Sequence, residues 1–345
     1  MMVFDGRRPL IPDIATMAGV STATVDRVLN RRSGVREATL RRVLEAAVHI
    51  GYMDKEELSK RLGPRFAKVV FLLPRGTNPY LTGLNTRVRE LADLSPGPVK
   101  VRSHFIESFN PDALAQALRR YGKSADTVVF MAIDHPQVRQ AIDELVMAGK
   151  RIITIISDLP SSNRHLYLGI DNFAAGRTAA QIMGRFCHVT SGKLALIAAS
   201  RAYRAHMERE MGFLALTEAS FPYLSVIGPH EGHDNRDENY QNTCRLLQAH
   251  PDIVGIYNVG GASDGIGRAL RESRRDADIC FIGHGLTPDT RSMLLDGTMD
   301  AVITQSPDLI YSRAIAAATG EQTDVAPVAM EIYFSENLPA AHHVM

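Results

Sequence analysis

Residues 11–30 read IPDIATMAGVSTATVDRVLN, and this stretch decides how the N-terminal end of the chain folds. Apolar residues recur at helical spacing before and after Gly19, which predicts two short helices. Gly19 stands at the turn between them, because glycine adopts a positive φ without a steric clash. Ser21 is a suitable N-cap for the second helix. Two short helices joined by a tight turn are typical of a helix-turn-helix, whose second helix lies in the major groove of DNA.

A third helix is predicted directly after this pair, so the N-terminal head is expected to be all-helical. The expected helices are Pro12–Ala18, Thr22–Asn30 and Arg36–Ile50. Val25, Val28 and Leu29 fall on one face of the second helix, which predicts a small apolar core. The alternative is a small helical subdomain with no role on DNA.

The charge is divided unevenly along the chain. Residues 1–68 contain 13 Lys or Arg and 8 Asp or Glu, whereas the remainder contains 26 and 30. The net charge of the whole chain, +1, hides this division. A basic head on an acidic body favours binding to the phosphate backbone of DNA. A solvated basic face with no partner would explain the charge but not the motif.

Short groups of residues fall at fixed spacing in the head. They are Asp13-Ile14-Ala15, Ala18-Gly19-Val20-Ser21, Thr24-Val25, Arg27-Val28-Leu29-Asn30, Val35-Arg36, Thr39 and Gly51-Tyr52. This set resembles the N-terminal signature of the lactose-repressor (LacI/GalR) family of bacterial transcription regulators. One departure is Asp26, where the family usually has Ser. An acid there would repel phosphate, unless it pairs with Arg27 or an arginine of the third helix.

The resemblance implies a set of DNA-contacting residues at the start of the second helix and beside it. They are expected to be Ser21, Thr22, Ala23, Thr24, Arg27, Asn30 and Arg36. Arg27 and the Thr22–Ala23 pair would read base edges, while neighbouring arginine and hydroxyl side chains would hold phosphates.

Composition excludes several other classes of protein. The 345 residues are 45% hydrophobic and 22% charged, which is ordinary for a globular protein. We find no apolar run long enough to span a membrane and no signal peptide at the N-terminus. Three scattered cysteines predict neither a disulfide framework nor a zinc site, and they suit a reducing cytoplasm. The sequence predicts no cofactor, no metal site and no catalytic constellation.

From Ala67 onward, short apolar runs alternate with helical segments. Ten such runs are too many for one comfortable parallel sheet, so two doubly wound sheets are expected. The predicted fold class is α/β, with an all-α helix-turn-helix head followed by two doubly wound parallel-sheet subdomains.

The body carries landmarks that resemble the type I periplasmic sugar-binding fold, which the same repressor family places behind its head. They include Asn78-Pro79-Tyr80, Gly169-Ile170-Asp171-Asn172, Gly212-Phe213, Ile282-Gly283 and Ile303-Thr304-Gln305. The expected domains are a head (1–53), a hinge or linker (54–66) and an effector-binding and dimerisation domain (67–345). By resemblance, one subdomain spans about 67–170 and 305–325, and the other about 171–304 and 326–345.

Ligands of parallel sheets bind at the carboxyl ends of the strands, so polar residues there are candidates for the effector site. They are Asn78, Tyr80, Asp134, Asp158, Arg209, Asn258, His284 and Gln305. Such a set suits a polyhydroxylated ligand, whose hydroxyls need partners once they leave water.

The candidate site departs from many sugar binders of this fold. Met207 stands where they have an Arg, and His284 stands where they have an Asp. The effector is therefore expected to be a small polar metabolite, such as a sugar or polyol. A regulator whose effector is an amino acid or a nucleobase-like compound is the alternative.

The linker after the head leaves two interpretations open. In the family it becomes a short hinge helix on operator DNA, where a leucine wedges into the minor groove, and Leu62 stands at the matching place. Asp54, Glu56, Glu57 and an early proline, Pro64, weaken this match. A plain flexible tether is the alternative.

Together these features predict a ligand-switched transcription regulator, expected to be a repressor. A homodimer would bind a pseudo-palindromic operator in double-stranded DNA, since the two-fold symmetry of the protein is mirrored in the half-sites. A transport-type binding protein would share the body but has no use for the head. A sugar-metabolising enzyme would share the alternating strands but needs catalytic groups that the sequence does not offer.

Overall fold

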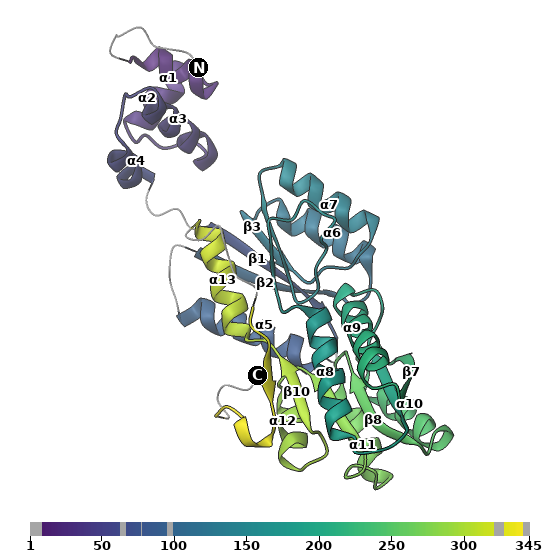
Figure 1. The fold of residues 1–345 in the computed structure, drawn as a ribbon. Helices are drawn as coiled ribbons and strands as arrows, with labels where there is room; N and C mark the ends of the chain where they lie inside the picture. Colours follow the sequence, from purple (N-terminus) through teal and green to yellow (C-terminus); the bar gives the residue numbers. More distant parts are fainter. Residues whose placement is uncertain (1–8, 63–66, 77, 95–98, 321–327, 341–345) are drawn as a thin grey trace. The chain divides into compact units, whose positions relative to one another are not determined.

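The computed structural model describes residues 9–62, 67–76, 78–94, 99–320 and 328–340. The chain divides into two compact units, Met1–Phe66 and Ala67–Met345. We call them the head and the body, and each is described by itself (Figure 1).

The head contains the helices α1 (Ile11–Ala18), α2 (Thr22–Leu29), α3 (Glu37–His49) and α4 (Lys55–Leu62). The first three confirm the predicted helices to within two residues at each end. Gly19 adopts the left-handed conformation with φ 60°, and its N–H donates to carbonyl groups of the last turn of α1. The Ser21 hydroxyl accepts the Thr24 N–H and caps α2. The apolar core of the head includes Ile14, Ala15, Ala18, Val25, Val28, Val43, Leu44, Ala47 and Ile50.

Helix α4 occupies much of the segment that the sequence left open between a helix and a tether. The Arg61 guanidinium joins it to the rest of the head: it donates to the Leu29 carbonyl at 2.8 Å and pairs with Glu57 at 2.6 Å. Residues 55–62 are therefore helical and packed within the head. Leu62 ends α4, but its side chain lies outside the described part of the chain, so its role as a minor-groove wedge stays a prediction.

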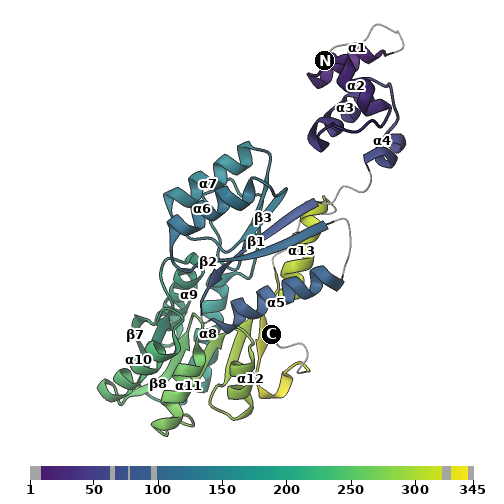
Figure 2. The same cartoon turned by 180° about the vertical axis from the view of Figure 1, so that it is seen from behind.

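The first sheet of the body, sheet A, has the strand order β2-β1-β3-β4-β5, and each described pair is parallel. Its strands are β1 (Ala67–Arg75), β2 (Val99–Glu107), β3 (Thr127–Phe130), β4 (Arg151–Ile155) and β5 (Leu166–Leu168). Helices α5 (Pro79–Leu94) and α13 (Pro307–Thr319) cover one face, and α6 (Pro111–Gly122) and α7 (Pro136–Met147) cover the other (Figures 1 and 2). Coverage on both faces explains the continuous apolar run Val69–Leu73 in β1.

The second sheet, sheet B, has the order β11-β10-β9-β8-β6-β7. Its strands are β6 (Gly192–Ala198), β7 (Leu224–Glu231), β8 (Ile253–Asn258), β9 (Cys280–His284), β10 (Ala301–Thr304) and β11 (Glu331–Tyr333). Leu194 and Leu196 pack in one apolar cluster, whereas Ala195 and Ile197 pack in another. This alternation shows that both faces of β6 are covered.

Five helices cover sheet B. On one face lie α8 (Asn172–Phe186) and α9 (Arg204–Ser220), and on the other lie α10 (Arg236–Ala249), α11 (Ser263–Glu272) and α12 (Pro288–Leu295). Strand β11 pairs antiparallel with β10. The sequence did not predict it, because a half-buried three-residue strand carries almost no periodic signal.

The predicted fold class is confirmed: an all-α head precedes two doubly wound, mainly parallel sheets. The chain passes between the sheets after β5, after β10 and after α13, and α13 returns to pack on sheet A. The exact subdomain boundaries drawn from the sequence stay a prediction.

Helices α8 and α9 pack against each other at backbone distance through two glycines. A Cβ built on Gly176 would lie 2.0 Å from the Arg209 carbonyl oxygen, and one on Gly212 would lie 2.1 Å from the Phe173 carbonyl oxygen. Neither neighbour is a flexible side chain, so a methyl group fits only if the two helices separate.

We therefore expect Gly176→Ala to lower the free energy of unfolding by about 1–3 kcal/mol, because overpacking strains the α8–α9 contact. Chemical denaturation of the purified protein measures this. Glu218→Ala on the exposed side of α9 is the control, and it should change stability by less than about 0.5 kcal/mol. Equal effects of the two substitutions would contradict the close packing.

Candidate functional site

Seven predicted DNA-contacting residues lie within α2, at its two caps and at the N-cap of α3. Ser21, Thr22, Ala23 and Arg27 are exposed. Among the described residues, no ion pair or side-chain hydrogen bond involves the Arg27 guanidinium. Thr24 is half-buried, and its hydroxyl lies 2.9 Å from the Ser21 hydroxyl. Helix α2 thus presents hydroxyl groups at its N-terminal cap and an exposed cation in its last turn.

The remaining head candidates are Asn30 and Arg36, and both are exposed. Asn30 already donates its amide N–H to Asp26 at 2.7 Å. Asp26 also pairs with Arg32 at 3.2 Å. The expectation that Asp26 would pair with Arg27 or with an arginine of the third helix is therefore wrong. Arg32 follows α2 directly and can reach back to Asp26, which leaves Arg27 unengaged.

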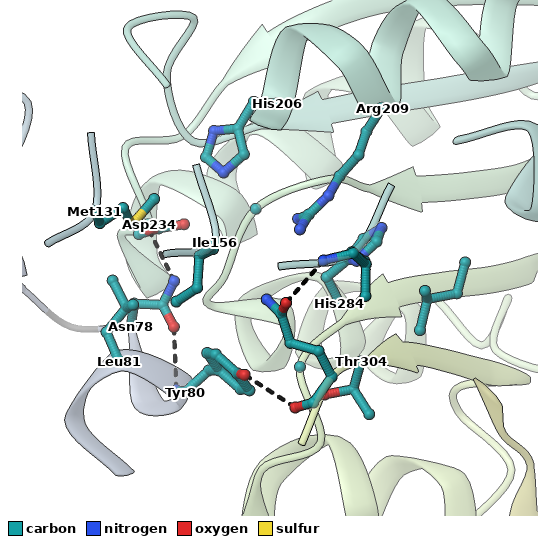
Figure 3. A pocket seen from close by; sticks show the side chains of 15 residues that line it. Asn78, Tyr80, Leu81, Met131, Ile156, His206, Arg209, Asp234, His284 and Thr304 are labelled. Carbon is teal, nitrogen blue, oxygen red and sulfur yellow. Dashed lines mark hydrogen bonds between the residues drawn. The ribbon is translucent and has the colours of Figure 1, made fainter. Parts of the chain in front are cut away.

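A cavity lies between the two sheets of the body, at the carboxyl ends of several strands (Figure 3). Its polar lining residues are Asn78, Tyr80, His206, Arg209, Asp234, His284, Thr304 and Gln305, and Leu81, Met131, Ile156, Ile170 and Ile303 add an apolar wall. Its volume is about 50 Å³, counted as the positions open to the centre of a water-sized sphere. By the same measure an ordered water needs about 10–15 Å³, so the cavity holds only a few waters.

Five of the eight predicted effector residues line this cavity: Asn78, Tyr80, Arg209, His284 and Gln305. Tyr80 donates its hydroxyl to the Gln305 carbonyl at 3.0 Å, and burial raises the pKa of Tyr80 well above its ordinary value. The Gln305 amide oxygen accepts the Ile170 N–H at 3.1 Å. These bonds fix Tyr80 and Gln305 at the crossing between sheet B and α13.

Asn78 reaches across the cavity from the position just before α5. Its amide donates to Asp234 at 3.0 Å, and its amide oxygen accepts the Tyr80 N–H at 3.1 Å. Asp234 follows β7 of sheet B, whereas Asn78 follows β1 of sheet A. One hydrogen bond therefore connects the two sides of the cleft directly.

Arg209 projects from α9 toward the centre of the cavity (Figure 3). Its Nε donates to the Asn172 amide oxygen at 2.8 Å, and one Nη donates to the Val259 carbonyl at 2.8 Å. The side chain is 5% exposed, and burial lowers the pKa of Arg209 from its ordinary value. Asn172 in turn donates to the Ile156 carbonyl, so Arg209 is positioned by both sheets.

Two histidines complete the polar wall. The His284 Nε2 lies 2.7 Å from the Tyr257 hydroxyl, and burial lowers the pKa of His284 well below its ordinary value. The charge of Arg209 adds to this decrease. The His206 Nδ1 lies 2.9 Å from the Ser200 carbonyl, and burial likewise lowers its pKa. Both imidazoles are therefore neutral near pH 7.

Three predicted effector residues do not line the cavity. Asp134 pairs with Arg139, and Asp158 pairs with Arg164 while accepting the Thr154 hydroxyl at 2.6 Å. Asn258 donates to the Gly261 carbonyl and to the Ser263 hydroxyl, each at 2.9 Å. A polar residue at a strand end is as useful for holding the next loop as for binding a ligand, and the sequence alone does not separate the two uses.

Sequence analysis missed His206 and Asp234, which also line the cavity. Asp234 follows β7, which runs to Glu231. The apolar run that predicts this strand stops before His230 and Glu231, so the sequence did not mark Asp234 as lying near a strand end.

A larger groove of about 680 Å³ lies along α5 and shares Thr304 and Gln305 with the cavity. Its rim holds Arg87, which pairs with Asp308 at 2.6 Å and with Glu90 at 3.2 Å. Arg87 is therefore already paired, and all three charged groups are partly solvated. The smaller cavity, with buried polar groups converging from several strand ends, is the better candidate for a small-molecule site.

We expect Asp158→Asn to lower stability by about 1–3 kcal/mol, because it leaves the half-buried Arg164 without its charged partner, while ligand affinity stays unchanged. Asp134→Asn is the matched control and should cost less, because both members of its ion pair are more exposed. Thermal unfolding and ligand titration of both variants measure this. Weaker ligand binding by Asp158→Asn with unchanged stability would return Asp158 to the binding site.

Two family models match the chain. The model described as "Bacterial regulatory proteins, lacI family" matches residues 10–54, and the "Periplasmic binding protein domain" matches residues 69–321. The chain is a lacI-family regulator with a periplasmic binding protein domain. The family resemblance predicted from the head and from the body is thereby confirmed.

Several curated relatives of this lacI-family regulator are transcription regulators, and others are ribose import binding proteins. The HTH-type transcriptional regulator CelR of Thermobifida fusca is 27% identical over 296 residues, which are 81% of this chain and 82% of CelR. The HTH-type transcriptional repressor PurR of Actinobacillus pleuropneumoniae is 26% identical and covers 72% of this chain and 71% of PurR. The chain is accordingly a DNA-binding transcription regulator and not an enzyme.

Solved structures share the fold of the body. A solute-binding protein from Burkholderia graminis in complex with D-arabinose superposes with a TM-score of 0.72 at 21% identity, covering 80% of this chain and 98% of that one. The glucose-galactose binding protein GanP of Geobacillus stearothermophilus gives 0.71 at 20% identity, covering 79% and 99%.

Within the described ranges, no helix is long and apolar enough to cross a membrane. In the same part of the chain, no three His, Cys, Asp or Glu side chains are grouped to hold a metal ion.

Proposed function

We propose that this regulator is a homodimeric repressor that binds a pseudo-palindromic operator and changes its operator affinity when a small polar metabolite, such as a sugar or polyol, binds in the body. The observation that carries the proposal is the cavity between sheets A and B, where buried polar groups from both sheets converge. Its fold is that of solute-binding proteins, and the same chain has a helix-turn-helix head.

The DNA-contacting roles expected from the family are kept for Ser21, Thr22, Ala23, Thr24, Arg27, Asn30, Arg36 and Leu62. Arg27 is the best candidate to bind a base edge, because its guanidinium is exposed and has no ion pair or side-chain hydrogen bond among the described residues. Ser21 and Thr24 bind phosphate with groups that also cap α2, since a helix N-terminus favours anions. Asn30 must exchange Asp26 for DNA if it contacts the operator.

A ligand switches the protein only if it binds two states with different affinities. The cleft offers a physical basis for two states, because the Asn78–Asp234 hydrogen bond joins its two sides over a cavity that holds only a few waters. A ligand of hexose size must widen the cleft and take over these hydrogen-bonding groups. If the operator binds the state with the narrow cleft, a ligand that widens the cleft lowers operator affinity; if the operator binds the wide state, the ligand raises it.

The alternative effector class is an amino acid or a nucleobase-like compound. As a chromosome-bound regulator the protein would work in the cytoplasm.

Arg27→Ala is expected to weaken binding to the specific operator roughly 10- to 100-fold, because a good bidentate base contact contributes about 1–3 kcal/mol. Fluorescence anisotropy with operator and scrambled duplexes at one fixed salt concentration measures this. Arg185→Ala removes the same charge from an exposed position on α8 and is the control. If Arg27→Ala binds the operator as tightly as the parent, the recognition-helix assignment fails.

A thermal-shift screen against sugars, polyols, sugar acids, sugar phosphates, amino acids and nucleobases tests the effector site. A true effector at one hundred times its Kd adds about 2.7 kcal/mol of stability and raises the unfolding temperature by several degrees. The same compound should change operator affinity, and operator DNA should change the affinity for the compound by the same factor. A compound that stabilises the protein but leaves operator affinity unchanged argues against the switch.

A further inference from the structure

Arg209 holds a positive charge inside the cavity without a carboxylate partner. A guanidinium has five N–H donors and stays protonated in proteins. Two of the five are used, by the Asn172 amide oxygen and the Val259 carbonyl. Across the described residues no Asp or Glu lies within ion-pair distance of Arg209. A cation that is 5% exposed and paired only with neutral oxygens is costly to bury unless a ligand completes its shell.

The one carboxylate that lines the cavity is already engaged. Asp234 accepts the Asn78 amide N–H through one oxygen and the Gly261 N–H through the other. Its charge raises the pKa of Arg209 less than the nearby hydroxyls of Tyr257, Tyr167 and Tyr80 do. The cavity therefore carries more donor capacity than acceptor capacity around Arg209.

His284 explains how this imbalance arises. It lines the cavity together with Arg209, whose charge lowers the pKa of His284 further. An Asp there would give Arg209 its counter-ion within the protein. A neutral imidazole bound to the Tyr257 hydroxyl gives none, so the counter-ion is left for the ligand to supply.

We propose that the effector is a hydroxylated carboxylic acid of the sugar-acid class, whose carboxylate pairs with Arg209. The inference rests on the effector function proposed above and names the chemical class of the effector. The planar fork of a guanidinium matches the two oxygens of a carboxylate. Asn78, His206 and Gln305 line the same cavity and carry polar groups that hydroxyls can bind.

A phosphate ester fits this cavity less well. At pH 7 it brings about 1.5–2 negative charges, and sites for it usually combine several cations or backbone N–H groups. Arg209 is the sole Lys or Arg among the residues that line the described cavity, and both histidines there are neutral. One cation balances one carboxylate.

The test compares pairs of compounds that differ in a carboxylate. Isothermal titration calorimetry of the full-length protein is run with galacturonate and galactose, glucuronate and glucose, and gluconate and glucitol. We expect at least one acid to bind at least ten-fold more tightly than its neutral partner. Equal or tighter binding of the neutral members, tighter binding of the corresponding sugar phosphates, or no binding by any acid at millimolar concentration would each overturn the proposal.

Two substitutions of one residue provide the decisive control. His284→Asp places a carboxylate beside Arg209 and should lower affinity for the acid at least ten-fold while raising the relative affinity for its neutral partner. His284→Asn has nearly the same size without the charge, and it should retain the preference for the acid. Circular dichroism and thermal unfolding verify that both variants fold. An unchanged preference in a folded His284→Asp protein would overturn the proposal.

Arg209→Lys checks the fork geometry. Lys keeps the charge but binds a carboxylate through one point, so affinity for the acid should fall while some preference over the neutral partner remains.

A change in operator affinity on adding any bound compound supports the proposed switch. A neutral sugar that binds and alters operator affinity would overturn the carboxylate inference and leave the regulator function intact.

Discussion

The buried guanidinium of Arg209 connects the parts on which the effector site depends. It projects from α9, bonds to Asn172 at the start of α8 and to the Val259 carbonyl after β8. Asn172 then reaches the Ile156 carbonyl after β4, so one cation ties sheet B to sheet A. These neutral oxygens offset part of the cost of burying that charge only when all of them are in place, so the geometry of the cleft is coupled to its packing.

The close contact of α8 and α9 serves the same constraint. Gly176 and Gly212 let the two backbones approach within a distance that a single methyl group would prevent. The approach sets where Arg209 enters the cleft. Packing far from the ligand thus determines the position of the group that we propose binds it, and the small cavity follows from how tightly these elements meet.

The head depends less on long-range contacts. Gly19 at φ 60° and the Ser21 cap are local features, and helical periodicity supplies the core around Val25 and Leu44. For this reason three of its helices were predictable to within two residues. Asp26 was harder, because its partner Arg32 lies beyond the end of α2 and only the folded turn brings the two together. Helix α4 was undecided from its sequence, and the Arg61 contact with Leu29 shows that packing stabilises it.

The sequence by itself determined the family, the helix-turn-helix, the two doubly wound sheets and five residues of the cavity, because periodicity, turn residues and the ends of parallel strands are local signals. Only the tertiary structure decided which polar strand ends face the cleft. Asp134, Asp158 and Asn258 bind their own neighbours, whereas Asp234 and His206 turn into the cavity. That choice depends on partners between 3 and 156 residues away, such as Gly261 for Asn258 and Asn78 for Asp234. A side chain is free for a ligand only after all of these competing partners have been placed in space.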